Sequence, residues 1–369
     1  MTPSFGRGQN ARSRRSLLAG LGVTAAGLSV FGLEGCAPKG RIGRNGEEAK
    51  LNLYNWDTYT GKTTLADFKS ATGVEVKMSL FANNDELFAK LKAGNPGFDV
   101  IVPSNDFVTR FRIADLLEPL DLAKIPNYAN ILPSFRNPPF DPGRRWSMPY
   151  TWLALGIGYR KSKVDGVPDS WKWVMDSDRY SGRIGVFSEA DDVVQLGAKY
   201  LGHSINKIPL PVIEQVAQMY IRQKRHIKVF HQDDGQDLLL AGDIDMVMEY
   251  NGDIAQVMAE DPDLDFVIPR EGSKLNSDCL CIPKGAPRPD NAHQFINFVL
   301  GAKNGAEIFE TIKYPSPNGA ANALMSDAYR KNTVIFPPDD VMARCEYGDF
   351  EGLDRSHLYD ETVTRILAA

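Results

Sequence analysis

The feature that most constrains the fold is an alternation of short apolar strands with amphipathic helices, which begins close to residue 51. The expected elements are strand Leu51–Asn55, helix Thr63–Thr72, strand Val74–Leu80, helix Asp85–Ala93 and strand Phe98–Val102. A βαβαβ order of this kind indicates a parallel sheet with helices on both of its faces.

A second unit of the same kind follows a Pro-rich loop at 133–149. Its strands are expected at Ile184–Phe187, Ile227–Phe230, Ile244–Glu249 and Phe266–Ile268. Helices are expected between them, at roughly 191–201, 211–224, 235–241 and 253–260. The unit again has the pattern of an α/β sheet covered by helices.

The last quarter of the chain supplies elements that lack partners of their own, a strand at Asp278–Ile282 and helices at 290–300 and 302–312. They complete the first sheet if the chain crosses back near residue 277. We therefore predict an α/β protein of two lobes, each a central, mostly parallel sheet flanked by helices, with a ligand cleft between them. The predicted first lobe comprises residues 50–151 and 278–338, and the second lobe residues 152–277 and 339–369.

The N-terminal 36 residues have the parts of an export signal. Ser13–Leu18 resembles a twin-arginine signal, and Leu17–Leu33 is an apolar run too short to be a comfortable membrane span. The signal ends at Leu33–Cys36, which resembles a lipobox, in which the cysteine is lipidated and becomes the mature N-terminus. An uncleaved signal anchor and an ordinary cleaved peptide remain open; each places the functional part outside the cytoplasmic membrane. The polar, Gly-rich residues 37–49 are typical of a flexible tether.

The composition is acidic, with 42 Lys and Arg against 47 Asp and Glu and a formal net charge of −5. This balance argues against a nucleic-acid partner, because the phosphate backbone selects basic surfaces. It is compatible with a cationic ligand. Beyond the N-terminal segment, no stretch of sequence is long and apolar enough to cross a bilayer.

The remaining cysteines do not form a recognisable metal or redox motif. Cys279 and Cys281 alternate with Leu280 in an expected strand, so they share one face and are interpreted as packed thiols. A disulfide from one of them to Cys345 remains open in an oxidising compartment. The spacing of Cys and His residues does not match a zinc site, and we predict no metal and no cofactor.

Ligands of open α/β sheets bind outside the carboxyl ends of the strands, which directs attention to the loops at those ends. These loops are rich in carboxylates and aromatic side chains, and Lys313 is the only base among them. The loops are 54–59, 103–107, 188–192, 249–253, 276–278 and 313–318. Opposed carboxylates with aromatic faces between them suit a ligand with separated ammonium groups and a methylene chain, which describes a polyamine.

Two simpler interpretations apply to single residues of these loops. A carboxylate at a helix N-terminus often caps exposed backbone N–H groups, which would account for Asp106, Asp191, Asp192 or Asp253. An aromatic residue in such a loop can belong to the core rather than to a site. The collective pattern, rather than any one residue, favours a ligand site.

Several runs of the sequence resemble the spermidine/putrescine-binding proteins that deliver polyamines to ABC importers. The resemblance covers residues 50–337. The matching runs are 53–56, 88–92, 98–104, 147–150, 296–300 and 314–318. It implies the two-lobe periplasmic-binding-protein fold and a ligand cleft between the lobes.

The resemblance also implies roles for residues of the expected first lobe. Trp56 and Tyr59 would be aromatic residues of the cleft, and Ser104 would be a polar contact to the ligand. Asp278 matches the central carboxylate of the family, and Tyr314 matches a tyrosine that faces the ligand.

In the expected second lobe, the resemblance implies that Asp192 binds an ammonium group, with Glu189 as a second candidate. Tyr250 stands where the family usually has a tryptophan, as one wall of an aromatic box. Asp253 matches an acid of the putrescine-type members. We expect Asp278 and Asp192, one from each lobe, to bridge the ligand.

The sequence departs from the family at three places in the expected cleft. Asn276 stands where an aromatic residue is common, and Asp106 where an aromatic or small residue is common. Asp57-Thr58 inverts the usual order of a hydroxyl followed by an acid. Asp57 and Asp106 are retained among the candidate ligand contacts, and the departures leave the particular polyamine open.

We therefore expect an extracytoplasmic, lipid-anchored, monomeric binding protein, exported by the twin-arginine route, that presents putrescine or spermidine to an ABC permease and has no catalytic residues. Three alternatives remain. In the first, the same fold serves another small cationic solute or ferric iron, although the paired tyrosines that resemble iron sites do not occur in the sequence. Asp191 and Asp192 suggest the acid and base of a secreted enzyme. A sensor that signals through a partner is the third alternative.

Overall fold

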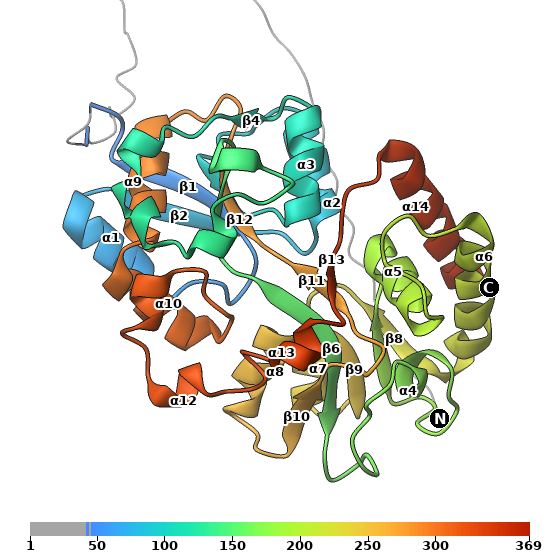
Figure 1. Ribbon diagram of the computed structural model, residues 1–369. Coiled ribbons are helices and arrows are strands. Elements are labelled where there is room, and N and C mark those ends of the chain that lie inside the picture. The colour runs from blue at the N-terminus through green and yellow to red at the C-terminus, as the bar shows by residue number, and fades with distance from the viewer. Residues whose placement is uncertain (1–41, 44–45) are drawn as a thin grey trace, which may run out of the picture. The chain divides into compact units, whose positions relative to one another are not determined.

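A computed structural model describes residues 42–43 and 46–369, and within them two β-sheets carry helices on their faces (Figure 1). This arrangement confirms the predicted α/β class. The twin-arginine-like run, the lipobox with Cys36 and part of the expected tether lie outside the described residues. Among the described residues, none of the helices combines the length and the apolar character that a membrane span requires.

The first sheet has the strand order β2-β1-β3-β12-β4, and β5 pairs with β12. Its strands are β1 (Lys50–Asn55), β2 (Glu75–Leu80), β3 (Val100–Ile101), β4 (Leu117–Glu118), β5 (Ser147–Pro149) and β12 (Cys279–Pro283). β1 is parallel to β2 and β3, as the βαβαβ pattern predicts. The return strand β12 runs antiparallel to β3, β4 and β5, so this sheet is mixed.

The second sheet has the order β13-β11-β6-β9-β7-β8, and β10 pairs with β6. Its strands are β6 (Leu153–Arg160), β7 (Ile184–Phe187), β8 (Ile227–His231), β9 (Met246–Tyr250), β10 (Leu264–Val267), β11 (Lys274–Asn276) and β13 (Glu346–Tyr347). β7 is parallel to β8 and β9, whereas β6 is antiparallel to β9, β10 and β11. This sheet is also mixed rather than mostly parallel, because β6 runs antiparallel to its neighbours. The order expected from the sequence lacked β6. That strand is buried on both faces and has no alternation to reveal it.

Helices cover both sheets, and most begin and end within two residues of the expected positions. Those on the first sheet are α1 (Thr64–Thr72), α2 (Asn84–Lys92), α3 (Asn105–Ile113), α9 (Pro289–Val299) and α10 (Ala302–Ile312). Those on the second sheet are α4 (Lys172–Met175), α5 (Ala190–Tyr200), α6 (Leu210–Gln223), α7 (Gly235–Leu240), α8 (Asn251–Met258) and α14 (Leu353–Ala368). Short helices α11 (Gly319–Asn322), α12 (Asp327–Arg330) and α13 (Asp339–Met342) lie in the segment between α10 and β13.

We call each sheet with its helices a lobe; the boundaries proposed from the sequence stay a prediction. The chain passes from the first sheet to the second between β5 and β6, and returns between β11 and β12. It reaches the second sheet again through β13, which pairs with β11, and ends in α14, which packs against α5 and α6 (Figure 1). Several chain segments therefore connect the lobes.

Strand β12 shows how one strand serves two layers of core. Leu280 and Ile282 pack in one apolar cluster, and Cys279 and Cys281 pack in another on the opposite face. Both cysteines are fully buried free thiols, and Cys345 is free as well. The expectation of packed thiols on a shared face is confirmed, and the alternative of a disulfide to Cys345 is not realised.

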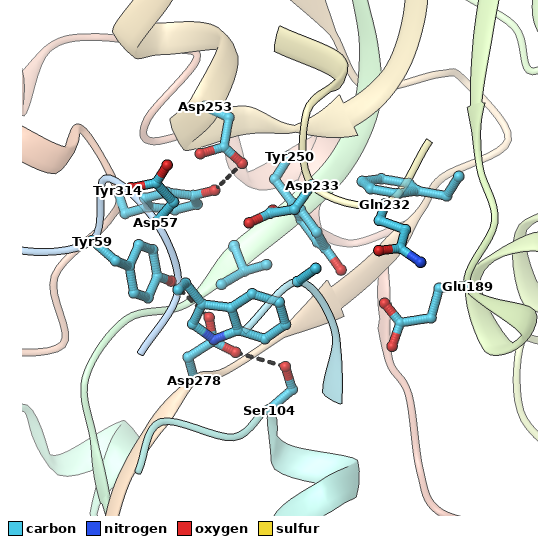
Figure 2. Close-up of a pocket in the computed structure, with 14 residues that line it drawn as sticks. Asp57, Tyr59, Ser104, Glu189, Gln232, Asp233, Tyr250, Asp253, Asp278 and Tyr314 are labelled. Atoms are coloured by element: carbon cyan, nitrogen blue, oxygen red, sulfur yellow. Dashed lines mark hydrogen bonds between the residues drawn. The ribbon is translucent and has the colours of Figure 1, made fainter. Parts of the chain in front are cut away.

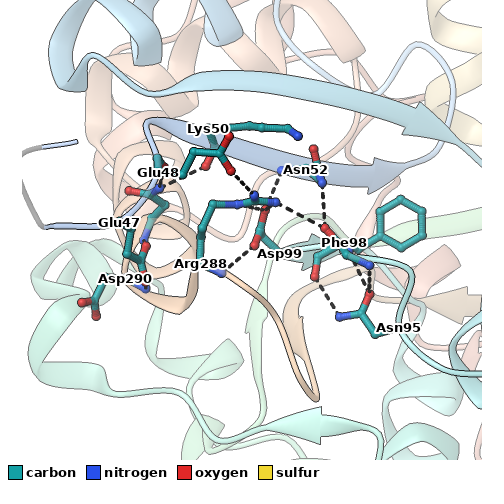
Figure 3. Close-up of polar contacts among 11 residues, drawn as sticks. Glu47, Glu48, Lys50, Asn52, Asn95, Phe98, Asp99, Arg288 and Asp290 are labelled. Carbon is teal, nitrogen blue, oxygen red and sulfur yellow. Dashed lines mark hydrogen bonds and ion pairs between the residues drawn. The ribbon is translucent and has the colours of Figure 1, made fainter. Parts of the chain in front are cut away.

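A buried ion pair connects the start of β3 to the start of α9 in the first lobe (Figure 3). The Arg288 guanidinium donates to Asp99 Oδ2 from Nε at 3.0 Å and from Nη2 at 2.9 Å. Asn52 N donates to the same oxygen at 2.7 Å, and Arg288 Nη1 reaches Glu48 at 2.8 Å. Because Asp99 is fully buried, this network fixes the returning chain against the first sheet.

Candidate ligand-binding site

A pocket lies between loops of the first lobe and loops of the second, and the space within it, including the part open to solvent, is about 450 Å³ (Figure 2). It opens at the carboxyl ends of β1, β3, β7, β8 and β9, as expected for open α/β sheets. It is lined by Trp56, Asp57, Tyr59, Ala82, Ser104, Leu153, Phe187, Glu189, Gln232, Asp233, Tyr250, Asp253, Asp278 and Tyr314. All the candidate residues from the sequence lie here except Asp106 and Asp192.

Asp278 lies at the base of the pocket, in the crossing between β11 and β12. Its Oδ2 accepts a hydrogen bond from Tyr59 Oη at 2.7 Å, and its Oδ1 accepts one from Ser104 Oγ at 2.7 Å (Figure 2). Its carbonyl oxygen accepts from Tyr150 N and Thr151 N, so the backbone is held as well. The carboxylate is therefore fixed in position before any ligand binds.

Burial raises the pKa of Asp278 to about 6, although the hydrogen bonds from Tyr59 and Ser104 act in the opposite direction. The side chain is buried, with 5% of its surface exposed. A cation placed against this carboxylate would favour its ionised form, so binding of a cation and loss of a proton are linked at this position.

Asp253 and Tyr314 form a second acidic position in the pocket. Asp253 lies in the first turn of α8, and its Oδ2 accepts a hydrogen bond from Tyr314 Oη at 2.5 Å (Figure 2). Burial raises the pKa of Asp253 to about 7. Gly252 permits the contact, because a Cβ there would lie 2.4 Å from the Tyr314 ring.

Contacts with neighbouring groups hold the aromatic rings of the pocket in place. Trp56 Nε1 donates to the Val102 carbonyl at 2.9 Å, which fixes the orientation of the indole. Tyr59 packs edge-to-face on Tyr314, with ring centroids 5.1 Å apart. The rings thus give the pocket rigid apolar surface between its carboxylates.

Asp233 and Gln232 are pocket residues that the sequence analysis missed. They follow β8, a strand that was expected, but the loop after it was not among the loops predicted to carry the site. β8 is parallel to β7, so its carboxyl end lies at the same edge of the sheet, and this rule would have found them. Burial raises the pKa of Asp233 well above its usual range, and nearby Asp253 and Asp278 raise it further.

Asp192 and Asp106 do not line the pocket. Asp192 was expected to bind a ligand ammonium. It instead forms an ion pair with Lys274, whose Nζ lies 2.8 Å from Asp192 Oδ1. Asp106 is buried near the start of α3, where burial raises its pKa and the charge of Lys274 lowers it. Lys274 lies in the three-residue strand β11, which the sequence analysis did not predict.

The charge of the pocket is one-sided. Its lining carries five carboxyl groups, and among the described residues that line it there is no Lys, Arg or His. The carboxyl groups belong to Asp57, Glu189, Asp233, Asp253 and Asp278. Burying acids without bases is costly, and a ligand with ammonium groups would offset that cost. No set of three or more His, Cys, Asp or Glu within the described chain has the geometry to hold a metal ion.

Two α/β lobes with a largely buried pocket between their strand ends define a protein that binds a small solute. The family model of bacterial extracellular solute-binding proteins matches residues 63–337. The chain belongs to this family, whose members bind solutes outside the cytoplasmic membrane.

Similarity to known proteins extends over most of the chain. The putrescine-binding periplasmic protein PotF of Escherichia coli is 31% identical over 317 residues, which cover 81% of this chain and 86% of PotF. A spermidine/putrescine-binding periplasmic protein of Salmonella typhimurium is 29% identical over 324 residues, covering 86% of this chain and 91% of the relative. The structure of a provisionally assigned spermidine/putrescine ABC transporter protein of Listeria monocytogenes superposes with a TM-score of 0.82 at 30% identity. That superposition covers 86% of this chain and 99% of the other.

Proposed function

We propose that the protein binds a polyamine outside the cytoplasmic membrane and delivers it to the permease of an ABC importer. The observation that carries the proposal is the lining of the pocket, which combines five carboxyl groups with aromatic rings and lacks a base among its described residues. Relatives that are named putrescine-binding or spermidine/putrescine-binding proteins support the same ligand class.

In this proposal, Asp278 and Asp253 bind the two ammonium groups of the ligand. Each carboxylate is already oriented by a tyrosine hydroxyl, Tyr59 for Asp278 and Tyr314 for Asp253. Ser104 completes the first position. Charge-assisted hydrogen bonds of this kind are about twice as strong as neutral ones.

The aromatic residues would hold the methylene chain between these positions. Trp56 and Tyr250 line the same pocket and present apolar surface to its interior. Asp57, Asp233 and Glu189 would add negative potential around the ligand. Asp57 is exposed, which suits a position at the mouth of the pocket.

The ligand would also select the closed arrangement of the lobes. Asp278 lies in a crossing between the lobes and Asp253 lies in α8 of the second lobe, so one ligand bound to both would connect the two lobes. A ligand that binds one arrangement better shifts the population toward it. The permease would recognise that closed arrangement. We propose that the protein binds its ligand without converting it chemically.

We also propose that the protein is a monomer anchored by a lipid on Cys36 after twin-arginine export. The support is the sequence Ser13–Leu18 and the lipobox-like Leu33–Cys36. Mass spectrometry of the N-terminal peptide from membranes tests this: a diacylated Cys36 is expected. An unmodified mature N-terminus at another position would contradict the anchor.

Isothermal titration of the purified, ligand-free protein with putrescine and then spermidine tests the proposed ligand. We expect saturable binding to at least one of them, with a dissociation constant of about 10 μM or tighter. Circular dichroism establishes that the sample is folded. Folded protein that binds neither amine would contradict a polyamine ligand and leave another cationic solute as the alternative.

A further inference from the structure

We propose that Asn105 is a positioning residue that holds the Asp278 carboxylate in place where the chain crosses between the lobes. This inference rests on the proposed binding function and adds a residue through which the protein aligns its ligand. Asn105 is the first residue of α3, is 2% exposed and does not line the pocket. Its effect on a ligand would therefore act through the residues that its side chain bonds.

The Asn105 side-chain amide connects α3 to two segments that are distant in the sequence. Its Oδ1 accepts a hydrogen bond from Ser277 N at 2.9 Å, in the crossing from β11 to β12. Its Nδ2 donates to the Gly348 carbonyl at 2.8 Å, in the segment between β13 and α14 of the second lobe. The amide therefore bonds a crossing and the second lobe rather than its own helix.

The other crossing joins this contact through Ser277. Ser277 Oγ donates to the Thr151 carbonyl at 3.1 Å, which ties the crossing between β5 and β6 to the crossing between β11 and β12. Thr151 N donates in turn to the Asp278 carbonyl at 3.2 Å. Ser277 and Thr151 are both buried. We call Asn105, Thr151, Ser277 and Gly348 the polar junction, because both crossings and the segment after β13 meet there.

The polar junction lies one residue away from the proposed ammonium position. Ser104 and Asp278 form an isolated antiparallel bridge, and Ser104 Oγ donates to Asp278 Oδ1 at 2.7 Å (Figure 2). Asn105 follows Ser104 in the chain, and Ser277 precedes Asp278. Because consecutive Cα atoms are only about 3.8 Å apart, a displacement of the Ser277 backbone passes directly to Asp278.

The polar junction matters because the proposed mechanism closes the lobes on the ligand. A few loop or element-terminal residues absorb the change of backbone angles in such a closure, and a carboxylate in a crossing would lose its alignment if its own segment moved. Asn105 opposes that movement, since it fixes Ser277 to α3, whose Phe107 and Phe111 are buried in an apolar cluster. Asp278 would thus keep its place in the first lobe while the second lobe closes.

The first test is titration of the native protein and of Asn105→Ala, which removes both hydrogen bonds of the amide. We expect the variant to bind putrescine at least about tenfold more weakly. The matched control is Asn291→Ala, at a fully buried asparagine whose Nδ2 donates to the Glu48 and Lys50 carbonyls outside the pocket. Its affinity should stay within about threefold of native. Native protein that binds neither putrescine nor spermidine would contradict the proposed function, whereas native affinity in a folded N105A would overturn only the role of Asn105.

The second test separates positioning from a general loss of stability. If Asn105 acts through Asp278, N105A should weaken binding less than about threefold once D278N has removed the carboxylate. Ser277→Ala, which removes the bond to Thr151 and keeps Asn105, covers the case in which N105A does not fold. It should weaken putrescine binding at least about threefold in the native background, and less than that in D278N. Urea unfolding verifies that each variant is folded. Equal losses of affinity in the two backgrounds, or native affinity in folded S277A, would overturn the inference.

Discussion

Asp278 illustrates how neighbouring side chains can orient one carboxylate of the proposed site. Both carboxylate oxygens already accept a hydroxyl hydrogen bond, from Tyr59 and from Ser104. Ser104 is in turn held by Asn84, whose Nδ2 donates to its Oγ at 3.1 Å. Each oxygen keeps a further lone pair for a ligand, and little side-chain entropy remains to be lost on binding.

Asp278→Asn should weaken putrescine binding by about 1.5–3 kcal/mol, which is about 10- to 150-fold in the dissociation constant. The amide keeps the shape of the side chain but removes the negative charge that pairs with the ammonium. Isothermal titration measures the loss. Asp243→Asn, at an exposed position outside the pocket, is the control and should bind as the native protein does. Near-native affinity of the Asp278 variant would remove this residue from the site.

At the scale of elements, the polar contact that holds β1, β3 and α9 together depends on one buried acid, Asp99. Asp99 accepts from Arg288 and from the backbone of Asn52, and none of its surface is exposed. Glu48 pairs with the same arginine but is 43% exposed. The two acids therefore differ in burial while sharing a partner.

Asp99→Ala should lower the free energy of unfolding by about 3–5 kcal/mol, because it leaves a buried guanidinium without its main partner. Glu48→Ala is the matched control and should cost less than about 1 kcal/mol, the usual range for an exposed pair. Urea unfolding followed by circular dichroism gives both values. Equal losses of unfolding free energy in the two variants would show that burial does not determine how much each acid contributes to stability.

Across the whole molecule, the pocket joins acids from both lobes whose pKa values are raised. Burial raises the pKa of Asp278 to about 6 and that of Asp253 to about 7, compared with about 4 for an exposed aspartate. An acid with a raised pKa in the folded state stabilises the ligand-free fold below about pH 4, and that contribution is lost as the pH rises through 6 to 7. A bound cation reverses this preference, because it favours the ionised carboxylates.

Putrescine affinity should therefore rise with pH between 5.5 and 8, by up to about a hundredfold per pH unit below pH 6 where both acids hold a proton, and then level off. Binding should release protons, since the ligand completes the ionisation of Asp278 and Asp253. Titrations at pH 5.5, 6.5, 7.5 and 8.5, repeated in buffers of different ionisation enthalpy, measure both effects. An affinity that is constant over this range would contradict the raised pKa values.

Much of the local structure was predictable because its signals are local. Helix periodicity and strand alternation located β1, β2, α5 and α10 to within about two residues, since short-range contacts set these elements. The position of the pocket was predictable from a general rule about the carboxyl ends of strands. That rule brought most candidate residues to one place before any contact was known.

Two of the missed strands, β6 and β11, depend on distant partners. β6 is buried on both faces, so its sequence carries no alternation. β11 has only three residues, and it is a strand because β6 and β13 pair with it. Without those partners, neither segment has a pattern that distinguishes it from a loop.

The sequence by itself determined the α/β class, the order of most elements and a cluster of acids and aromatic residues at the strand ends. Only the tertiary structure decided which of those acids remain open to a ligand. Asp192 and Lys274 are 82 positions apart, and no local pattern indicates that they meet. Their pairing arises because α5 and β11 pack together in the second lobe, where burial makes the ion pair obligatory.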